Sequence, residues 1–167
     1  MTSLAGSFLI ARPVLQDPNF HQSVVLLLQH GAEGAFGLVV NRATKVDSLP
    51  FPVYQGGPCS SEGFMMVHGH EDWIEPSALP LENQVAPGLF LGDAESFRKV
   101  TDNDSQSELR FRVFAGYSGW GPDQLENEMV TGAWAVTPAS AELLFDTPPD
   151  ELWQKLVPPS FPQPSIN

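Results

Sequence analysis

The first half of the chain alternates short apolar runs with turn-forming residues, which is typical of β-strands. The longest apolar run, Val-Val-Leu-Leu-Leu at 24–28, suits a strand buried on both faces, and we expect that strand over residues 22–29. A turn at 30–34 and a second apolar run over 35–41 predict a β-hairpin. Further strands are expected at residues 7–11, 63–68, 108–117 and 85–91, where Pro87 favours an edge position or a bulge.

The segment 108–117 has the clearest alternation of apolar and polar positions. Arg110 and Arg112 lie two residues apart, so a strand here places both on one face. Basic residues in this pattern can hold a phosphate, but a solvated sheet face is the simpler interpretation and the one we adopt.

Helices are predicted mainly in the second half, from capping residues and proline positions. Four are expected, at 94–100 after an Asp93 cap, from Pro122 to about Val130, from Thr137 through Phe145, and from Thr147 through Leu156. Strands followed by strands mixed with short helices indicate an α+β fold rather than a regular βαβ alternation.

The length of 167 residues and a hydrophobic fraction of 42% fit one globular domain, which we place at residues 1–157. Prolines at 158, 159, 162 and 164 block helix formation, so residues 158–167 are expected to form an extended tail.

The chain is strongly acidic, with 8 Lys and Arg against 20 Asp and Glu and a formal net charge of -12. Such a charge repels nucleic-acid phosphates and anionic membrane surfaces, so we expect no direct nucleic-acid partner and no membrane association. The five-residue apolar run is far too short to span a bilayer. Cys59 is the single cysteine and the N-terminus has no basic region, which favours the cytoplasm.

Four stretches, taken together, carry a family resemblance. They are Gly6-Ser-Phe-Leu-Ile-Ala11 with Asp17-Pro-Asn-Phe20; Ser23-Val-Val-Leu-Leu-Leu-Gln-His30 with Gly34-Ala-Phe-Gly-Leu-Val-Val-Asn-Arg42; Gln55-Gly-Gly-Pro58; and Phe114-Ala-Gly-Tyr-Ser-Gly-Trp120 with Gln124-Leu-Glu-Asn-Glu128 and Trp134. In their order and spacing, from about Leu4 to Leu156, the chain resembles the AlgH/YqgE family of bacterial proteins.

The resemblance implies an antiparallel, partly barrel-like sheet with short helices packed on it, and it implies no established activity because the family is largely uncharacterised. One member's name carries a label of transcriptional regulator of alginate synthesis, but no DNA-binding motif in this chain supports that role. Family members usually have Val in place of Cys59 and often Ala in place of Ser118, so the resemblance gives neither side chain a family-wide catalytic role.

Three motifs that suggest chemistry have simpler structural interpretations. The segment Gly116-Tyr-Ser-Gly-Trp120 lacks the second glycine of a nucleophile elbow, so we interpret it as a tight turn. The glycines at 31, 34 and 37 lead into a strand rather than a helix, which favours a hairpin over a phosphate loop. His68 and His70 have no third ligand at a diagnostic spacing, so we expect no metal and no cofactor.

The candidate site combines the end of the 35–41 strand, the double glycine and the start of the helix after Trp120. We expect one ligand-binding cleft formed by His30, Asn41, Arg42, Gly56, Gly57, Ser118, Trp120, Gln124, Glu126 and Glu128. Arg42 is expected to pair with Glu126 or Glu128. That pair could be a purely structural link between helix and sheet, or it could line a polar cleft with Trp120 as an aromatic wall.

These patterns favour a non-enzymatic regulatory or adaptor module that binds a protein or a small ligand, with any effect on transcription being indirect. No catalytic residue is assigned. The alternative is a hydrolase or transferase that uses His30, Arg42 and Glu128 around the double glycine. That alternative requires the three groups to lie within hydrogen-bond reach, directly or through one water.

Overall fold

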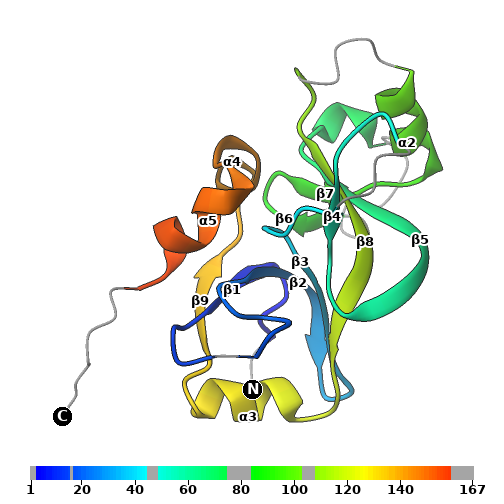
Figure 1. The fold of residues 1–167 in the computed structure, drawn as a ribbon. Coiled ribbons are helices and arrows are strands. Elements are labelled where there is room, and N and C mark those ends of the chain that lie inside the picture. The colour runs from blue at the N-terminus through cyan, green and yellow to red at the C-terminus, as the bar shows by residue number, and fades with distance from the viewer. Residues whose placement is uncertain (1–2, 16, 45–48, 75–83, 103–107, 159–167) are drawn as a thin grey trace.

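The computed structural model describes residues 3–15, 17–44, 49–74, 84–102 and 108–158. In this part of the chain a nine-stranded sheet curls into a nearly closed barrel with short helices around it (Figure 1). The strands are β1 Ser7–Ala11, β2 Val24–Gly31, β3 Gly34–Val39, β4 Val53–Gln55, β5 Cys59–His68, β6 Gln84–Ala86, β7 Leu89–Leu91, β8 Phe111–Trp120 and β9 Trp134–Pro138. The helices are η1 Glu71–Trp73, α2 Ala94–Thr101, α3 Gln124–Val130, α4 Ala141–Asp146 and α5 Pro149–Leu156.

The strand order is β6-β7-β5-β8-β3-β2-β1-β9, and β4 adds to β8 outside this path. Every pair is antiparallel except β4 with β8. The predicted α+β class and mostly antiparallel, partly barrel-like sheet are therefore confirmed. In Figure 1, α2 lies at the upper end of the barrel, α3 closes the lower end, and α4 and α5 lie to one side.

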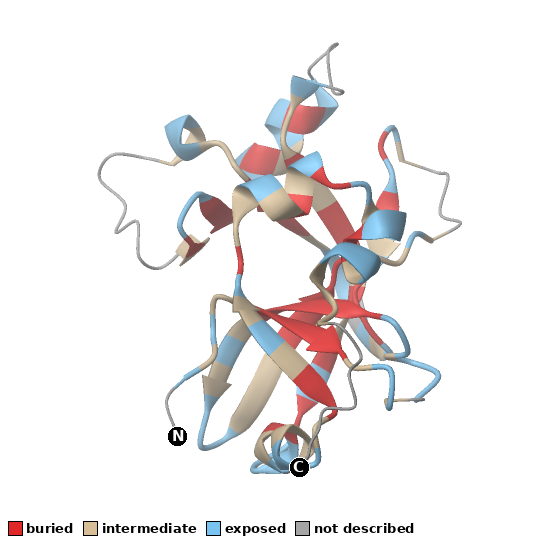
Figure 2. Ribbon diagram, turned by 90° about the vertical axis from the view of Figure 1, so that its left-hand side faces the viewer, coloured by how far each residue is buried: buried red, intermediate tan, exposed pale blue. Residues whose placement is uncertain are grey.

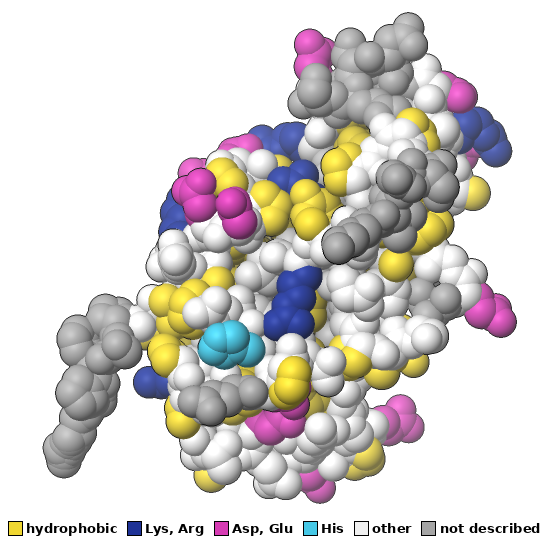
Figure 3. Space-filling model, in the orientation of Figure 1, with side chains coloured by type: hydrophobic (Ala, Val, Ile, Leu, Met, Phe, Trp, Pro, Cys, Tyr) yellow, Lys and Arg dark blue, Asp and Glu magenta, His cyan; other side chains and the backbone are white. Residues whose placement is uncertain are grey.

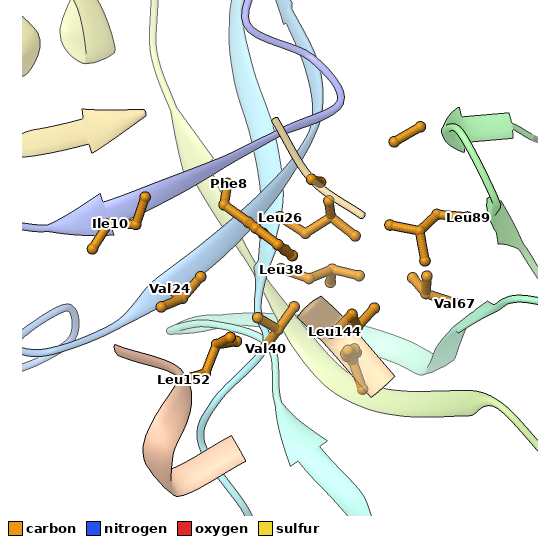
Figure 4. Packing of buried hydrophobic residues seen from close by; sticks show 13 residues of the cluster. Phe8, Ile10, Val24, Leu26, Leu38, Val40, Val67, Leu89, Leu144 and Leu152 are labelled. Atoms are coloured by element: carbon orange, nitrogen blue, oxygen red, sulfur yellow. The ribbon is translucent and has the colours of Figure 1, made fainter. Parts of the chain in front are cut away.

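The β2–β3 hairpin forms as predicted, with His30 opposite Ala35 and Val25 opposite Val39. Strand β2 extends to Gly31, so the turn is shorter than expected. The prediction that this strand is buried on both faces is confirmed, since Val24 and Leu26 belong to one core cluster and Val25 and Leu27 to another. Figure 4 shows side chains of the first cluster, among them Phe8, Leu26 and Leu38, gathered between the strands.

Strand β8 is the centre of the sheet because it pairs with β3, β4 and β5. It runs from Phe111 to Trp120, so the predicted tight turn at 116–120 is wrong. The reason is that Gly116, with φ of 76°, bends the strand without ending it. The strand thus carries the chain from the upper to the lower end of the barrel (Figure 1).

Two further predictions need correction. The segment 85–91 is not one strand but the hairpin β6–β7, which turns at Pro87 and Gly88, where φ is 77°. Thr137 and Pro138 end β9 instead of starting a helix, and α4 begins after Ser140, whose side chain accepts a hydrogen bond from the Leu143 amide. Pro138 is tolerated because β9 pairs only with β1, at the edge of the sheet.

The helices cover parts of the barrel. Figure 2 shows buried residues concentrated along the strands and exposed residues on the outer surfaces of the helices. The helix start at Asp93 is confirmed, with a reciprocal pair of hydrogen bonds to Ser96. Helix α3 begins at Gln124, and Pro122 precedes it rather than opening it.

Candidate functional site

His30 and Glu126 join β2 to α3 at the lower end of the barrel. The Nε2 atom of His30 lies 2.7 Å from Oε2 of Glu126, and the Leu4 amide donates to Nδ1 over 2.9 Å. Because Nδ1 accepts a hydrogen bond, the proton of the neutral ring is on Nε2 and points to the carboxylate. This hydrogen bond lowers the pKa of Glu126. Both ring nitrogens of His30 are therefore occupied by structural partners.

Glu128 connects α3 to the ends of two strands. Its Oε1 atom accepts hydrogen bonds from the indole nitrogens of Trp120, at 3.0 Å, and Trp134, at 2.8 Å. Its Oε2 atom accepts a weaker bond from the Gln124 amide at 3.3 Å. Phe20 stacks on Trp120 and meets the edge of Trp134. These contacts fix the helix on the sheet, so Trp120 is a buried part of the core rather than the wall of a cleft.

Asn41 and Arg42 hold the loop before β2 at the other end of the hairpin. Arg42 donates to the carbonyl oxygens of Asn19 at 2.5 Å and His21 at 2.7 Å, with a longer contact of 3.4 Å to Pro18. The Asn41 side chain accepts from the Val24 amide and donates to the Gln22 carbonyl. Burial lowers the pKa of Arg42, and the nearby Asp17 partly opposes this shift.

Gly56 and Gly57 pack directly against β8. The Gly56 carbonyl accepts hydrogen bonds from the Val39 amide at 2.8 Å and from the buried Ser118 hydroxyl at 3.0 Å. A Cβ atom on Gly57, where φ is 154°, would lie 2.2 Å from the Tyr117 carbonyl oxygen. Larger residues are excluded by this close approach, so the double glycine has a structural reason and Ser118 serves as its hydrogen-bond donor.

The predicted single cleft divides into two separate groups. His30 lies near the turn of the β2–β3 hairpin, and Arg42 follows its opposite end, about 20 Å away at ~3.3 Å per residue. Helix α3 follows Trp120, which pairs with Ala35 beside the turn, so Glu126 and Glu128 lie with His30. The expected ion pair between Arg42 and one of these glutamates is therefore wrong, because the two ends of the hairpin separate them.

Arg42 and Gly57 do line one pocket of about 240 Å³. Its other lining residues are Asn19, Val39, Gln55 and Pro58. Sequence reasoning missed Asn19 and Gln55 as site residues, although both belong to motifs that carry the family resemblance. The Gln55 side chain donates to the Gly57 carbonyl, which shapes one side of the pocket.

A second, larger depression of about 650 Å³ lies over residues 29–35 of the hairpin. All of its lining residues are consecutive in the chain, and His30, one of them, has both ring nitrogens occupied. Among the described residues, no group of three or more His, Cys, Asp or Glu could hold a metal ion. Nor is any helix in the described ranges long and apolar enough to cross a membrane.

The profile of the AlgH-like family matches residues 8–159. The chain belongs to this family. A UPF0301 protein of Streptomyces avermitilis is 36% identical over 170 residues, covering 94% of this chain and 86% of that one. A UPF0301 protein of Vibrio parahaemolyticus is 32% identical over 175 residues, covering 93% and 90%. The resemblance inferred from the sequence motifs is therefore confirmed.

Two solved structures share the fold of this AlgH-like chain. The solution structure of AlgH from Pseudomonas aeruginosa has a TM-score of 0.68 at 30% identity, covering 92% of this chain and 87% of that one. A crystal structure of a Corynebacterium diphtheriae protein has a TM-score of 0.73 at 22% identity, covering 92% and 85%. The overall fold is thus shared over most of the length of these proteins.

Proposed function

We propose that this AlgH-like protein is a non-enzymatic regulatory or adaptor module that binds a partner protein at the pocket beside Arg42. The observation that carries the proposal is the approach of Arg42, Gln55 and Gly57, from two separate segments, around one hollow of about 240 Å³. A positive charge at this hollow is notable in a chain with a net charge of -12.

The size of the pocket favours a partner's side chain over a cofactor. Pockets for drug-sized ligands usually measure ~300–1,000 Å³, and this one measures about 240 Å³. Its lining includes Arg42, Asn19 and Gln55, whose side chains carry a guanidinium and two amides. These groups suit a carboxylate or amide side chain of a partner, such as Asp, Glu, Asn or Gln.

The hydrolase or transferase alternative has less support. It needs His30, Arg42 and Glu128 to act together, but His30 and Glu128 are hydrogen-bonded to structural partners around α3. The hairpin separates His30 from Arg42 by about 20 Å, a distance that one bridging water does not span.

Any effect on transcription is proposed to pass through the partner protein. Binding to DNA needs clustered Lys and Arg that neutralise phosphates, and this chain has 8 such residues against 20 acidic ones. A regulatory role exerted by protein contact does not have this electrostatic cost.

A photo-cross-linking amino acid placed at Pro58, which is exposed and lines the pocket, tests the proposal. We expect it to capture a specific partner in cells, and we expect the same group at Val130, 85% exposed on α3, not to capture it. The affinity of the captured partner is then measured by calorimetry for the unmodified protein and for Arg42→Gln and Gln55→Ala.

Each pocket substitution is expected to weaken binding by about tenfold or more, as central interface residues do. Arg98→Gln, which changes an exposed arginine on α2, is the charge-matched control and should leave the affinity unchanged. Equal capture from Val130, or the same affinity after both pocket substitutions in folded protein, would contradict the proposal.

A further inference from the structure

Arg110 and Arg112 converge on one aromatic ring. Arg110 directly precedes β8 and Arg112 is the second residue of that strand, and both guanidinium carbons are 5.5 Å from the centre of the Phe145 ring on α4. The Arg112 guanidinium also lies 5.7 Å from the centre of the Tyr54 ring on β4. In Figure 3, basic side chains lie next to hydrophobic ones between the α4 region and the strands. Three elements thus hold two cations side by side.

The charge of this pair is poorly balanced. Arg112 forms no ion pair with any described Asp or Glu; it donates only to the backbone carbonyls of Phe111, at 3.1 Å, and Leu144, at 3.4 Å. Arg110 meets Asp146 at 3.4 Å, a long contact between half-exposed side chains. Among the described residues, Asp146 is thus the one carboxylate paired with these two guanidinium groups, in a chain where acidic residues far outnumber basic ones.

Unused hydrogen-bond donors mark the same place. Among the described residues, three buried side-chain nitrogens have no hydrogen-bond partner, and two of them are the Nε atoms of Arg110 and Arg112. Burial also lowers the pKa of Arg112, an effect that Tyr54 partly opposes. Buried donors without partners are rare in folded proteins and each calls for an explanation, one of which is an absent anion.

Anchoring of α4 explains only part of this arrangement. Leu144 lies in the last turn of α4, where a nearby cation is favourable for the helix dipole. However, the contacts to Leu144 and Asp146 are both 3.4 Å long, beyond the usual range for a strong hydrogen bond. These long contacts leave the Nε–H donors of both guanidinium groups without partners, and a bound anion would provide acceptors for such donors.

We propose that Arg110 and Arg112 form a binding site for the oxyanion of a small molecule, either a phosphate ester or a carboxylate. Planar guanidinium groups bind both anions with pairs of parallel hydrogen bonds. The aromatic rings of Phe145 and Tyr54 hold the Arg112 guanidinium in place and shield it partly from water, which strengthens such bonds. This site is separate from the pocket beside Arg42, and neither proposal depends on the other.

Titration of ¹⁵N-labelled protein with phenyl phosphate, inorganic phosphate and benzoate tests the site, because NMR resolves the Nε–H signals of arginine directly. Sodium chloride at the same ionic strength is the blank. We expect saturable shifts of the Arg110 and Arg112 Nε–H signals with at least one oxyanion. A stronger effect of phenyl phosphate than of benzoate assigns the site to phosphate esters, and the reverse assigns it to carboxylates.

Arg110→Gln and Arg112→Lys are expected to weaken the binding by about tenfold, since each removes one bidentate fork. Arg110 is half-exposed, so its substitution should leave the fold intact even if Arg112 proves essential for folding. Arg98→Gln on α2 is the matched control. The absence of saturable shifts at both Nε–H signals, or unchanged affinity in folded Arg110→Gln, overturns the proposal.

Discussion

Two polar regions at opposite ends of β8 differ in how well their hydrogen-bonding groups are satisfied. Around α3, His30 is paired with Glu126, and Glu128 accepts from both Trp120 and Trp134. At the start of the strand, Arg110 and Arg112 keep buried Nε–H donors without partners. The first region contains residue types that are common in catalytic sites, but here they form structural hydrogen bonds between α3 and the sheet. The unsatisfied donors, and not the residue types alone, are what single out the second region as the proposed anion site.

The largest effect that tests this comparison is expected for Glu128→Ala. It removes the acceptor of two indole N–H groups and the link from α3 to β8 and β9, so the free energy of unfolding should fall by about 3 kcal/mol. Urea denaturation followed by tryptophan fluorescence measures it. Glu142→Ala, an exposed position in the first turn of α4, is the control. A loss no greater than that of the control would show that the network around α3 is not a scaffold.

An intermediate effect is expected from acidification, through His68 on β5. Burial lowers the pKa of His68 to about 4, with a further contribution from His70, while Asp93 and Asp72 oppose the shift. The unfolded chain binds this proton near pH 6.5, so stability should fall as the pH decreases from about 6.5 to 4, by on the order of 2 kcal/mol.

NMR titration of the His68 ring measures that pKa directly, and urea unfolding between pH 7.5 and pH 4.5 measures the linked loss of stability. His68→Phe keeps an aromatic ring between Trp73 and Phe90 and should flatten this part of the pH profile. A His68 pKa near the ordinary value would contradict the expectation. It would mean that the buried Nε2 atom of His68 has a partner in solution and does not belong with the unsatisfied nitrogens of Arg110 and Arg112.

The smallest effect is expected for Arg112→Met. The side chain keeps its apolar contacts with Tyr54 and Phe145 and loses a half-buried cation that has no carboxylate partner, so the stability should change by less than ~1 kcal/mol in either direction. Urea unfolding in buffer without oxyanions measures this. A loss as large as that of Glu128→Ala would make Arg112 a structural anchor, and the contrast between the two regions would disappear.

Much of the fold could be predicted from local sequence because local physics decides it. The run at 24–28 had to be buried on both faces, and Asp93 had to cap a helix, whatever surrounds them. Strand β9 was missed because Thr137 and Pro138 look like a helix start, and only its pairing with β1 makes it a strand. The continuation of β8 through Gly116 was missed because the same glycine suits a turn or a bent strand.

Of the residues that line the pocket, sequence reasoning named Arg42 and Gly57, missed Asn19 and Gln55, and could not give the grouping. The order of the motifs gives the positions of Arg42, Gly57 and Glu128 along the chain. It does not show which end of the β2–β3 hairpin each residue lies near. The register of β2 with β3, and of β3 with β8, puts Glu128 beside the turn and Arg42 at the opposite end. The positions of charged residues in a sequence do not specify strand register, so they could not show that Arg42 and the two glutamates lie far apart.

By itself the sequence determined the family, the α+β class, the acidic character and the main hairpin of this protein, since motifs, composition and apolar periodicity are properties of the chain. Only the tertiary structure decided which polar groups are satisfied. Hydrogen bonds such as those of Glu128 join residues from different elements, and the unpaired donors of Arg110 and Arg112 depend on what β4 and α4 bring near them. Whether a polar group has a hydrogen-bond partner depends on which residues lie near it in the folded protein, and the spacing of residues along the sequence does not specify them.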